Sequence, residues 1–237
     1  MDYLIADKNL IYSDEEELYS EKIIYMPSIW NCHYGLNLER TKTELPALKN
    51  NFITFGSFNN FLKINDDVVK VWSSILKNVP NSKLILKTSI PTANTIILEK
   101  FKQNGINNSV EFLKYNKSFE DHLNEYKKVD IALDTFPWNG VTTSFEAIWM
   151  GVPVLTMKGF NFNSRCGESI NLNLGLKELI AENQKDYIEK ASLISGNKKK
   201  LEDIRNRIFE NALVSPLFDS KKFSKSFFEC LQNIYKK

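Results

Sequence analysis

The sequence LDTFPWNGVTTSFEAIWMGVP, residues 133–153, joins an apolar segment to a short helix-like one through a turn rich in glycine and threonine. Residues 131–133 predict a buried strand that ends at this turn, and residues 143–150 predict a helix. Residues 154–157, VLTM, predict the next strand. Strands that alternate with helices at this spacing are typical of a parallel sheet.

The same alternation extends outward from this stretch. Upstream of it, strands are predicted at residues 52–55, 84–86 and 110–113, and helices at residues 66–77, at 92–103 and from 118 onward. In the first of these helices the apolar residues recur along one stripe, and Asp66 and Asp67 favour its N-terminus. We therefore predict an α/β fold in which a Rossmann-like parallel sheet carries helices on both faces.

The two ends of the chain differ from this centre. Residues 1–50 are less regular, with one predicted strand at residues 22–25. No strand is expected after residue 165, so the remainder predicts a helical C-terminal tail. The last helix of this tail has four apolar side chains on one face, those of Phe223, Phe227, Leu231 and Ile234.

Composition excludes several classes of protein. Hydrophobic residues make up 43% and charged residues 25% of the 237 positions, a balance typical of globular proteins. The formal net charge of +2 gives no basic excess for binding nucleic acid. No apolar run reaches the ~18–20 residues that span a membrane, and the first residues lack the basic region of a signal peptide. We expect a cytoplasmic protein that binds neither nucleic acid nor membrane.

The cysteines and histidines suggest no metal centre. Cys32, Cys166 and Cys230 are widely spaced and odd in number, so they form neither a disulfide framework nor a CxxC site. No cluster of histidine, cysteine and carboxylate residues has the spacing of a metal site. We expect reduced thiols, no metal and no cofactor.

The turn at residues 139–143, NGVTT, follows a predicted strand, and ligands of open parallel sheets bind at the carboxyl ends of the strands. Free amides and the positive end of the helix dipole favour an anion there, and Thr142 and Thr143 add hydroxyl donors. Gly140 lets the backbone approach a ligand closely. An ordinary capped helix is the alternative, because Thr is a common N-cap and Asn-Gly a common turn.

A second segment, FNNFLKI at residues 58–64, follows an earlier predicted strand, so Lys63 should lie at the same edge of the sheet. Taken alone, this residue could equally be a solvated loop lysine. Together with LDTFPWNGVTT, the segment resembles the C-terminal half of the catalytic region of the O-linked N-acetylglucosamine transferase and SPINDLY family. The similarity continues through WMGVPVLT at residues 149–156 and SPLF at residues 215–218, and it covers roughly residues 45–235.

This resemblance implies a glycosyltransferase of the GT-B type, in which two Rossmann-like domains face a cleft and the C-terminal domain holds most of the nucleotide sugar. It implies that Lys63 is the catalytic lysine, which contacts the donor diphosphate and stabilises the charge that grows on the leaving group. Thr142 and Thr143 correspond to the pair that holds the same diphosphate, beside Gly140.

Three further residues are assigned to the donor by the resemblance. Asn60 corresponds to a polar contact of the diphosphate, and His122 corresponds to a histidine beside the nucleoside. Glu146 stands where better-known members have an aspartate that reaches the ribose hydroxyls. A longer carboxylate can accept the same hydrogen bonds.

The chain departs from the family pattern at two site positions and at its front. Val141 replaces a histidine that would donate to phosphate, and Glu125 lies where an arginine near the base is expected. The N-terminal Rossmann domain and the tetratricopeptide repeats of the family have no counterpart in this sequence. We expect residues 1–50 to be a remnant of that domain or a linker from it, and residues 51–237 to be the nucleotide-sugar-binding domain with its C-terminal helices.

Other conspicuous residues are interpreted as structural. Trp138 and Trp149 are expected to pack in the core or in the cleft wall rather than to stack on a sugar. Asp134 is expected to brace the loop after its strand rather than to act as a base. His33 has no motif around it and is interpreted as a loop histidine.

The first functional hypothesis is the donor-binding half of an inverting glycosyltransferase that moves a sugar to a protein Ser or Thr hydroxyl. UDP-N-acetylglucosamine is the expected donor, and GDP-fucose stays open. Expected partners are the nucleotide sugar, a protein or peptide acceptor, and a separate chain that supplies the N-terminal domain. The alternative is a non-catalytic module that binds a nucleotide sugar or a partner. A nucleotide-sugar epimerase shares the two-domain architecture, but the sequence places no acid and base for that reaction.

Overall fold

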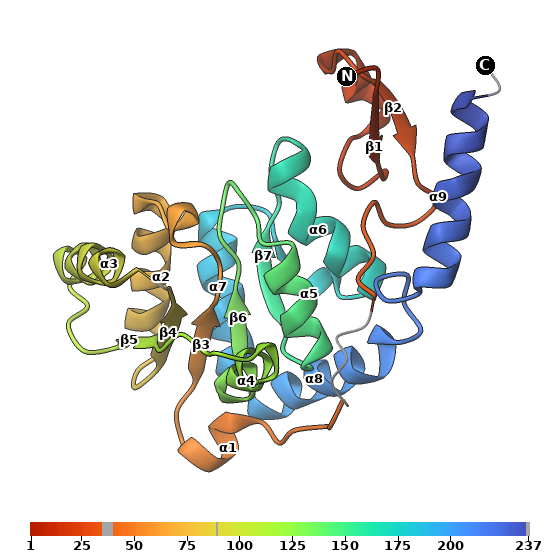
Figure 1. Ribbon diagram of the computed structural model, residues 1–237. Coiled ribbons are helices and arrows are strands. Elements are labelled where there is room, and N and C mark those ends of the chain that lie inside the picture. The colour runs from red at the N-terminus through yellow and green to blue at the C-terminus, as the bar shows by residue number, and fades with distance from the viewer. Residues whose placement is uncertain (35–39, 89, 236–237) are drawn as a thin grey trace.

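The computed structural model describes residues 1–34, 40–88 and 90–235 (Figure 1). The strands are β1 (Tyr3–Ala6), β2 (Lys22–Tyr25), β3 (Thr54–Ser57), β4 (Lys83–Lys87), β5 (Val110–Leu113), β6 (Ile131–Leu133), β7 (Val154–Met157) and β8 (Ile180–Ala181). The α-helices are α1 (Pro46–Asn50), α2 (Asp66–Asn78), α3 (Pro91–Gln103), α4 (Phe119–Asn124), α5 (Thr142–Trp149), α6 (Phe162–Leu174), α7 (Gln184–Ser195), α8 (Lys198–Ala212) and α9 (Ser220–Tyr235). Short 3-10 helices are η1 (Ser13–Leu18), η2 (Phe61–Lys63), η3 (Glu125–Lys128) and η4 (Lys177–Leu179).

A parallel sheet with the strand order β5-β4-β3-β6-β7-β8 forms the centre of the molecule. Every neighbouring pair in it runs parallel. The chain winds outward from β3 to β5 and then returns to place β6 on the other side of β3. This is the strand order of a Rossmann-like sheet, and the carboxyl ends of β3 and β6 mark the switch point at which such sheets bind ligands.

Helices cover both faces of this sheet: α5 lies in front of it in Figure 1, and α7 lies behind. On the rear face α2 packs against α7. The N-terminus of α2 is capped by the Asn65 side chain, which accepts from the Val68 amide at 2.9 Å. The predicted apolar stripe of α2 is buried, with Trp72 fully enclosed. The predicted α/β fold class, with helices on both faces and a helical C-terminal tail, is confirmed.

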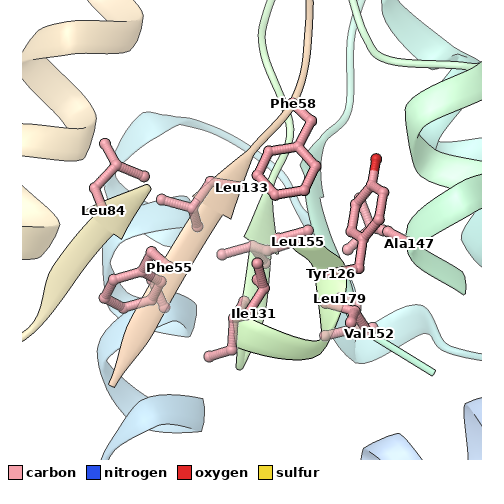
Figure 2. Close-up of a cluster of buried hydrophobic side chains, with 14 of the residues drawn as sticks. Phe55, Phe58, Leu84, Tyr126, Ile131, Leu133, Ala147, Val152, Leu155 and Leu179 are labelled. Atoms are coloured by element: carbon pink, nitrogen blue, oxygen red, sulfur yellow. The ribbon is translucent and has the colours of Figure 1, made fainter. Parts of the chain in front are cut away.

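The core lies between the sheet and these helices. Figure 2 shows Phe55 of β3, Leu133 of β6 and Leu155 of β7 in one cluster of buried side chains, with the ring of Tyr126 beside Phe58. Strands buried on both faces are typical of parallel sheets, and each large apolar side chain removed from water contributes about 1.5–3 kcal/mol. The core therefore fixes the strands whose carboxyl ends form the site.

Most predicted elements match the structure, with two corrections. The first strand of the main sheet is Thr54–Ser57 rather than residues 52–55, because the C-cap of α1, Asn51, has left-handed backbone with φ 61° and the chain enters the sheet only after it. The expectation of no strand after residue 165 is wrong, since β8 pairs with β7. A strand of 2 residues is too short to leave an alternation in the sequence.

The N-terminal segment, residues 1–33, packs against α6. Its β1, which the sequence did not predict, pairs with β2 in a separate parallel sheet. Asp7 is buried, and its carboxylate accepts from Ser169 Oγ at 2.7 Å and from the Trp30 amide at 3.0 Å. Arg165 of α6 forms an ion pair with Glu15 at 2.5 Å. These polar contacts hold the segment beside the loops that follow β6 and β7.

Candidate functional site

The loops after β3 and β6 meet at the switch point of the sheet. Lys63 lies at the end of η2, and its ammonium donates a hydrogen bond to the Asn139 carbonyl at 2.7 Å. Thr143 Oγ1 donates to Asn59 Oδ1 at 3.0 Å. The structure thus brings together Lys63 and the turn before α5, two segments that are far apart in the sequence.

The start of α5 has donors without partners. Val141 is the N-cap residue and its side chain caps nothing. Across the part of the chain that the structure describes, the amides of Val141, Thr142 and Thr143 donate to no protein acceptor. The Thr142 side chain is exposed and Thr143 is half-buried. Unpaired amides at the positive end of a helix form an anion site. The alternative of a threonine N-cap is wrong, because Val141 occupies the N-cap position.

Gly140 is required by close contacts. A Cβ atom at this position would lie 2.7 Å from both Asn59 Oδ1 and Thr143 Oγ1. The Gly140 amide is already engaged, since it donates to Asp134 Oδ1 at 2.6 Å. A side chain here would displace the Asn59 amide and the Thr143 hydroxyl and break the hydrogen bond between them.

Asp134 braces the turn from beneath, as expected from the sequence. Its carboxylate is 1% exposed and accepts from the amides of Gly140 at 2.6 Å and Thr135 at 2.9 Å, and from Thr156 Oγ1 at 2.8 Å. Burial raises the pKa of Asp134 to about 6, against the effect of these hydrogen bonds. Burial also lowers the pKa of Lys63, and the Asp134 carboxylate counteracts that shift. The aspartate therefore positions the turn, and its carboxylate favours the charged form of the nearby lysine.

The two tryptophans interpreted as packing residues differ. Trp149 is 8% exposed and packs against Phe218. Trp138 is 58% exposed, so it is no core residue, and its ring centroid lies 5.0 Å from Lys63 Nζ. An aromatic face at this distance attracts an ammonium. Trp138 thus forms an open wall beside Lys63.

His122 and Glu146, which the sequence assigned separately to the nucleoside, are paired in the structure. Nε2 of His122 on α4 lies 3.0 Å from Oε2 of Glu146 on α5. Tyr126 donates its hydroxyl to the same Glu146 oxygen at 3.0 Å. Nδ1 of His122 lies 2.5 Å from Nζ of Lys87, the last residue of β4. Burial raises the pKa of Tyr126 well above its usual value.

Sequence reasoning missed three residues of this constellation. It selected Asn60, whose side chain caps η2 by accepting from the Leu62 amide, whereas its buried neighbour Asn59 contacts Thr143. Lys87 ends a strand at the same sheet edge as Lys63, and that position was a signal that could have found it. Tyr126 gave no signal, because its apolar ring looks like any other core side chain.

The positions that depart from the family pattern have local explanations. Val141 packs between the main core and the N-terminal segment, beside Leu10 and Cys166. Glu125 pairs with Lys128 at 2.5 Å. His33, interpreted as a loop histidine, donates its amide to the Leu217 carbonyl at 2.9 Å.

Residues 1–34, 40–88 and 90–235 contain no group of three or more histidine, cysteine, aspartate or glutamate side chains that could hold a metal ion. Among the helices within these ranges, none is long and apolar enough to cross a membrane.

Comparison with known proteins gives consistent matches. The model of the family described as Glycosyl transferase family 41 matches residues 36–227. A Solanum lycopersicum protein described as a probable UDP-N-acetylglucosamine–peptide N-acetylglucosaminyltransferase SPINDLY is 33% identical over 240 residues, which cover 100% of this chain and 25% of that protein. Its Eustoma exaltatum counterpart is 35% identical over 227 residues, or 94% of this chain and 25% of that protein.

Solved structures show the same relationship. An O-GlcNAc transferase mutant from Thermobaculum terrenum superposes with a TM-score of 0.86 at 28% identity, covering 99% of this chain and 44% of that chain. S. aureus TarM superposes with a TM-score of 0.66 at 12% identity over 93% of this chain, which shows a shared fold. The chain thus spans about a quarter of the length of the curated relatives it matches. The resemblance to the C-terminal half of the O-GlcNAc transferase and SPINDLY catalytic region is confirmed, and the chain belongs to glycosyl transferase family 41.

Proposed function

We propose that this chain is the donor-binding half of an inverting glycosyltransferase that modifies Ser or Thr hydroxyls of proteins, with UDP-N-acetylglucosamine as the donor. The observation that carries the proposal is the convergence of the Lys63 ammonium and the unpaired amides of α5 on the switch point of the sheet. A nucleoside diphosphate carries negative charge, which the Lys63 ammonium and the α5 amides attract. Membership of family 41 supports transfer of a sugar to protein.

In the proposed reaction the acceptor oxygen attacks the anomeric carbon from the face opposite the diphosphate. The bond to the diphosphate breaks, its electron pair stays with the departing nucleotide, and the hydroxyl proton is released to solvent. Lys63 stabilises the growing phosphate charge as a partly desolvated point charge. The amides of Thr142 and Thr143 are fixed by the fold and cost no reorganisation during the reaction. His122 and Glu146 hold the nucleoside.

The counter-charge in this proposal comes from the protein, so transfer needs no divalent metal. Treatment with a chelator should leave donor binding unchanged. A loss of donor affinity in EDTA that magnesium restores would overturn this part of the proposal.

A non-catalytic module that binds a nucleotide sugar is the second candidate. The chain covers 44% of the length of the solved relative, and this candidate concerns that stretch by itself. Transfer requires an acceptor hydroxyl held about 3–3.5 Å from the anomeric carbon, and we propose that the surface that orients it lies in an N-terminal half supplied by further sequence or by another chain.

Two measurements test these candidates. Calorimetry with UDP, GDP and their sugars asks whether a nucleoside diphosphate binds at all, and a preference for GDP would replace the proposed donor by a GDP-sugar. A radiolabelled-donor assay then compares this chain with a fusion to a homologous N-terminal domain, with cell extract as acceptor. We expect donor binding by both and transfer by the fusion. Absence of nucleotide binding at millimolar concentration would refute the site, and binding without transfer by either protein would leave the second candidate standing.

A further inference from the structure

Lys87 lies at the carboxyl end of β4, half-buried, on the nucleoside side of the site. Its ammonium is 2.5 Å from Asn116 Oδ1 and 2.5 Å from His122 Nδ1. An ammonium has hydrogens to donate and nothing with which to accept. Nδ1 of His122 must therefore be the acceptor, so the proton of the neutral imidazole sits on Nε2.

This assignment agrees with the contacts on the other side of the ring. Nε2 faces Glu146 Oε2 at 3.0 Å, and a carboxylate accepts what Nε2–H donates. Glu146 is 4% exposed, and the same oxygen accepts from the Tyr126 hydroxyl at 3.0 Å. Tyr126 lies 3.2 Å from the carbonyl of Thr143 as well. A continuous polar chain thus runs from β4 through α4 to the first turn of α5.

Burial lowers the pKa of Lys87, while the carboxylates of Glu125 and Glu146 act in the opposite direction. The lysine is therefore compensated by two acidic groups on neighbouring elements. With both ring nitrogens engaged, His122 can meet a ligand only through a face or edge of its ring, and Lys87 is one of the two side chains placed to hydrogen-bond to that ring.

We propose that Lys87 is a positioning residue of the nucleoside end: it fixes the tautomer and ring orientation of His122. Through Glu146 and Tyr126 it keeps this end aligned with the diphosphate end at Thr143. The effect of Lys87 on nucleotide binding rests on the proposed function. The tautomer assigned to His122 does not depend on any ligand.

Long-range ¹H–¹⁵N spectra of protein labelled at histidine test the tautomer directly. The sequence has 2 histidines, so a His33→Asn variant assigns the signals of His122. We expect the proton on Nε2, and a displaced Nδ1 signal in Lys87→Met, which loses the ammonium. A proton found on Nδ1 in the unmodified protein would overturn the proposal without any binding experiment.

Ligand affinities then separate the two ends of the site. Lys87→Met should weaken binding of UDP about tenfold and leave inorganic pyrophosphate within about twofold, because only the nucleoside end is disturbed. Lys87→Arg, which keeps a cation, should recover most of the UDP affinity. The control is Lys83→Met, at the other end of β4, where the ammonium pairs with the half-exposed Glu111. Equal UDP affinities of Lys87→Met and the unmodified protein would refute the positioning role. Failure of the unmodified protein to bind UDP or GDP would instead refute the proposed function.

Discussion

The two ends of the site are built in opposite ways. At the end proposed to bind the diphosphate, Thr142 and Thr143 present amides with no protein acceptor in the described chain, beside Lys63, whose ammonium donates to the Asn139 carbonyl and faces the Trp138 ring. At the end proposed to bind the nucleoside, both ring nitrogens of His122 face a side chain of the protein, and Glu146 serves two neighbours with one oxygen. The first end has unused capacity for an anion, whereas at the second the imidazole of His122 and one oxygen of Glu146 are already engaged by the protein.

This difference indicates how each end treats a ligand. Unpaired donors in a fixed turn gain a full set of hydrogen bonds when a diphosphate arrives, so affinity should come mainly from that end. An internally paired network gains few new hydrogen bonds and instead fixes shape. Substitutions at the diphosphate end should therefore weaken every phosphate ligand, and those at the nucleoside end only ligands that carry a base.

The largest effect is expected for Gly140→Ala. Its Cβ would lie 2.7 Å from two side-chain oxygens, so the Asn59 amide and the Thr143 hydroxyl must move from the positions in which they hydrogen-bond to each other. We expect UDP and pyrophosphate to bind up to about a hundredfold more weakly, in line with the roughly 1–3 kcal/mol that overpacking costs. Gly196→Ala, where the nearest atom would be 3.2 Å from the Cβ, is the control. Unchanged pyrophosphate binding by Gly140→Ala would show that the turn is not the anion site.

Asp134→Asn should change the pH dependence of stability. Because burial raises the pKa of Asp134 from 3.8 to about 6, the folded state keeps a proton that the unfolded chain has lost between these pH values. Its contribution to stability therefore falls as pH rises through this window, by on the order of 2–3 kcal/mol, and stays low above it.

The asparagine variant has no such charge and should not show this fall. Urea unfolding at several pH values from 4 to 7 measures the difference between the two profiles. Asp66→Asn serves as control, because the Asp66 side chain is 86% exposed. Parallel profiles for the unmodified protein and Asp134→Asn would contradict the assignment of a buried carboxyl that titrates near pH 6.

Lys63→Ala should weaken UDP and pyrophosphate alike, by about ten- to thirtyfold, since a charge-assisted hydrogen bond in a partly desolvated site contributes about 1.5–2 kcal/mol. Lys70→Ala removes an equal charge from the exposed face of α2 and should change neither affinity measurably. Calorimetry on the two variants provides the comparison. If the two variants lost the same affinity, the loss would reflect net charge and not a contact of Lys63 with the ligand.

The smallest effect is expected at Trp138, whose ring lies 5.0 Å from the Lys63 ammonium. Trp138→Leu should weaken pyrophosphate about two- to fivefold, because an exposed cation–π contact contributes roughly 0.5–1 kcal/mol. Trp138→Phe keeps an aromatic face and should retain most of the affinity. Identical losses in the two variants would mean that the ring acts by bulk rather than by attracting the lysine.

Local patterns in the sequence were sufficient for much of this molecule. The alternation of apolar segments and amphipathic stretches predicted β5, β6 and β7 at their observed bounds and the helices between the strands. Because parallel strands present their carboxyl ends at one edge, the positions of Lys63 and of the turn at Gly140 also followed. The two-residue β8 did not follow, since so few residues carry no readable period. The strand β1 was not predicted either.

The sequence alone determined that a lysine and a glycine-threonine turn share one sheet edge, because strands that alternate with helices run parallel and the loops that follow them lie at their carboxyl ends. The contacts between these loops and their neighbours exist only in the folded chain. Only the tertiary structure decided that Asn59 rather than Asn60 reaches Thr143. Lys87 likewise meets His122, 35 positions along the chain, only because α4 packs beside the carboxyl end of β4. Such pairings depend on the packing of side chains between distant segments, and this is set by the whole core rather than by any local pattern.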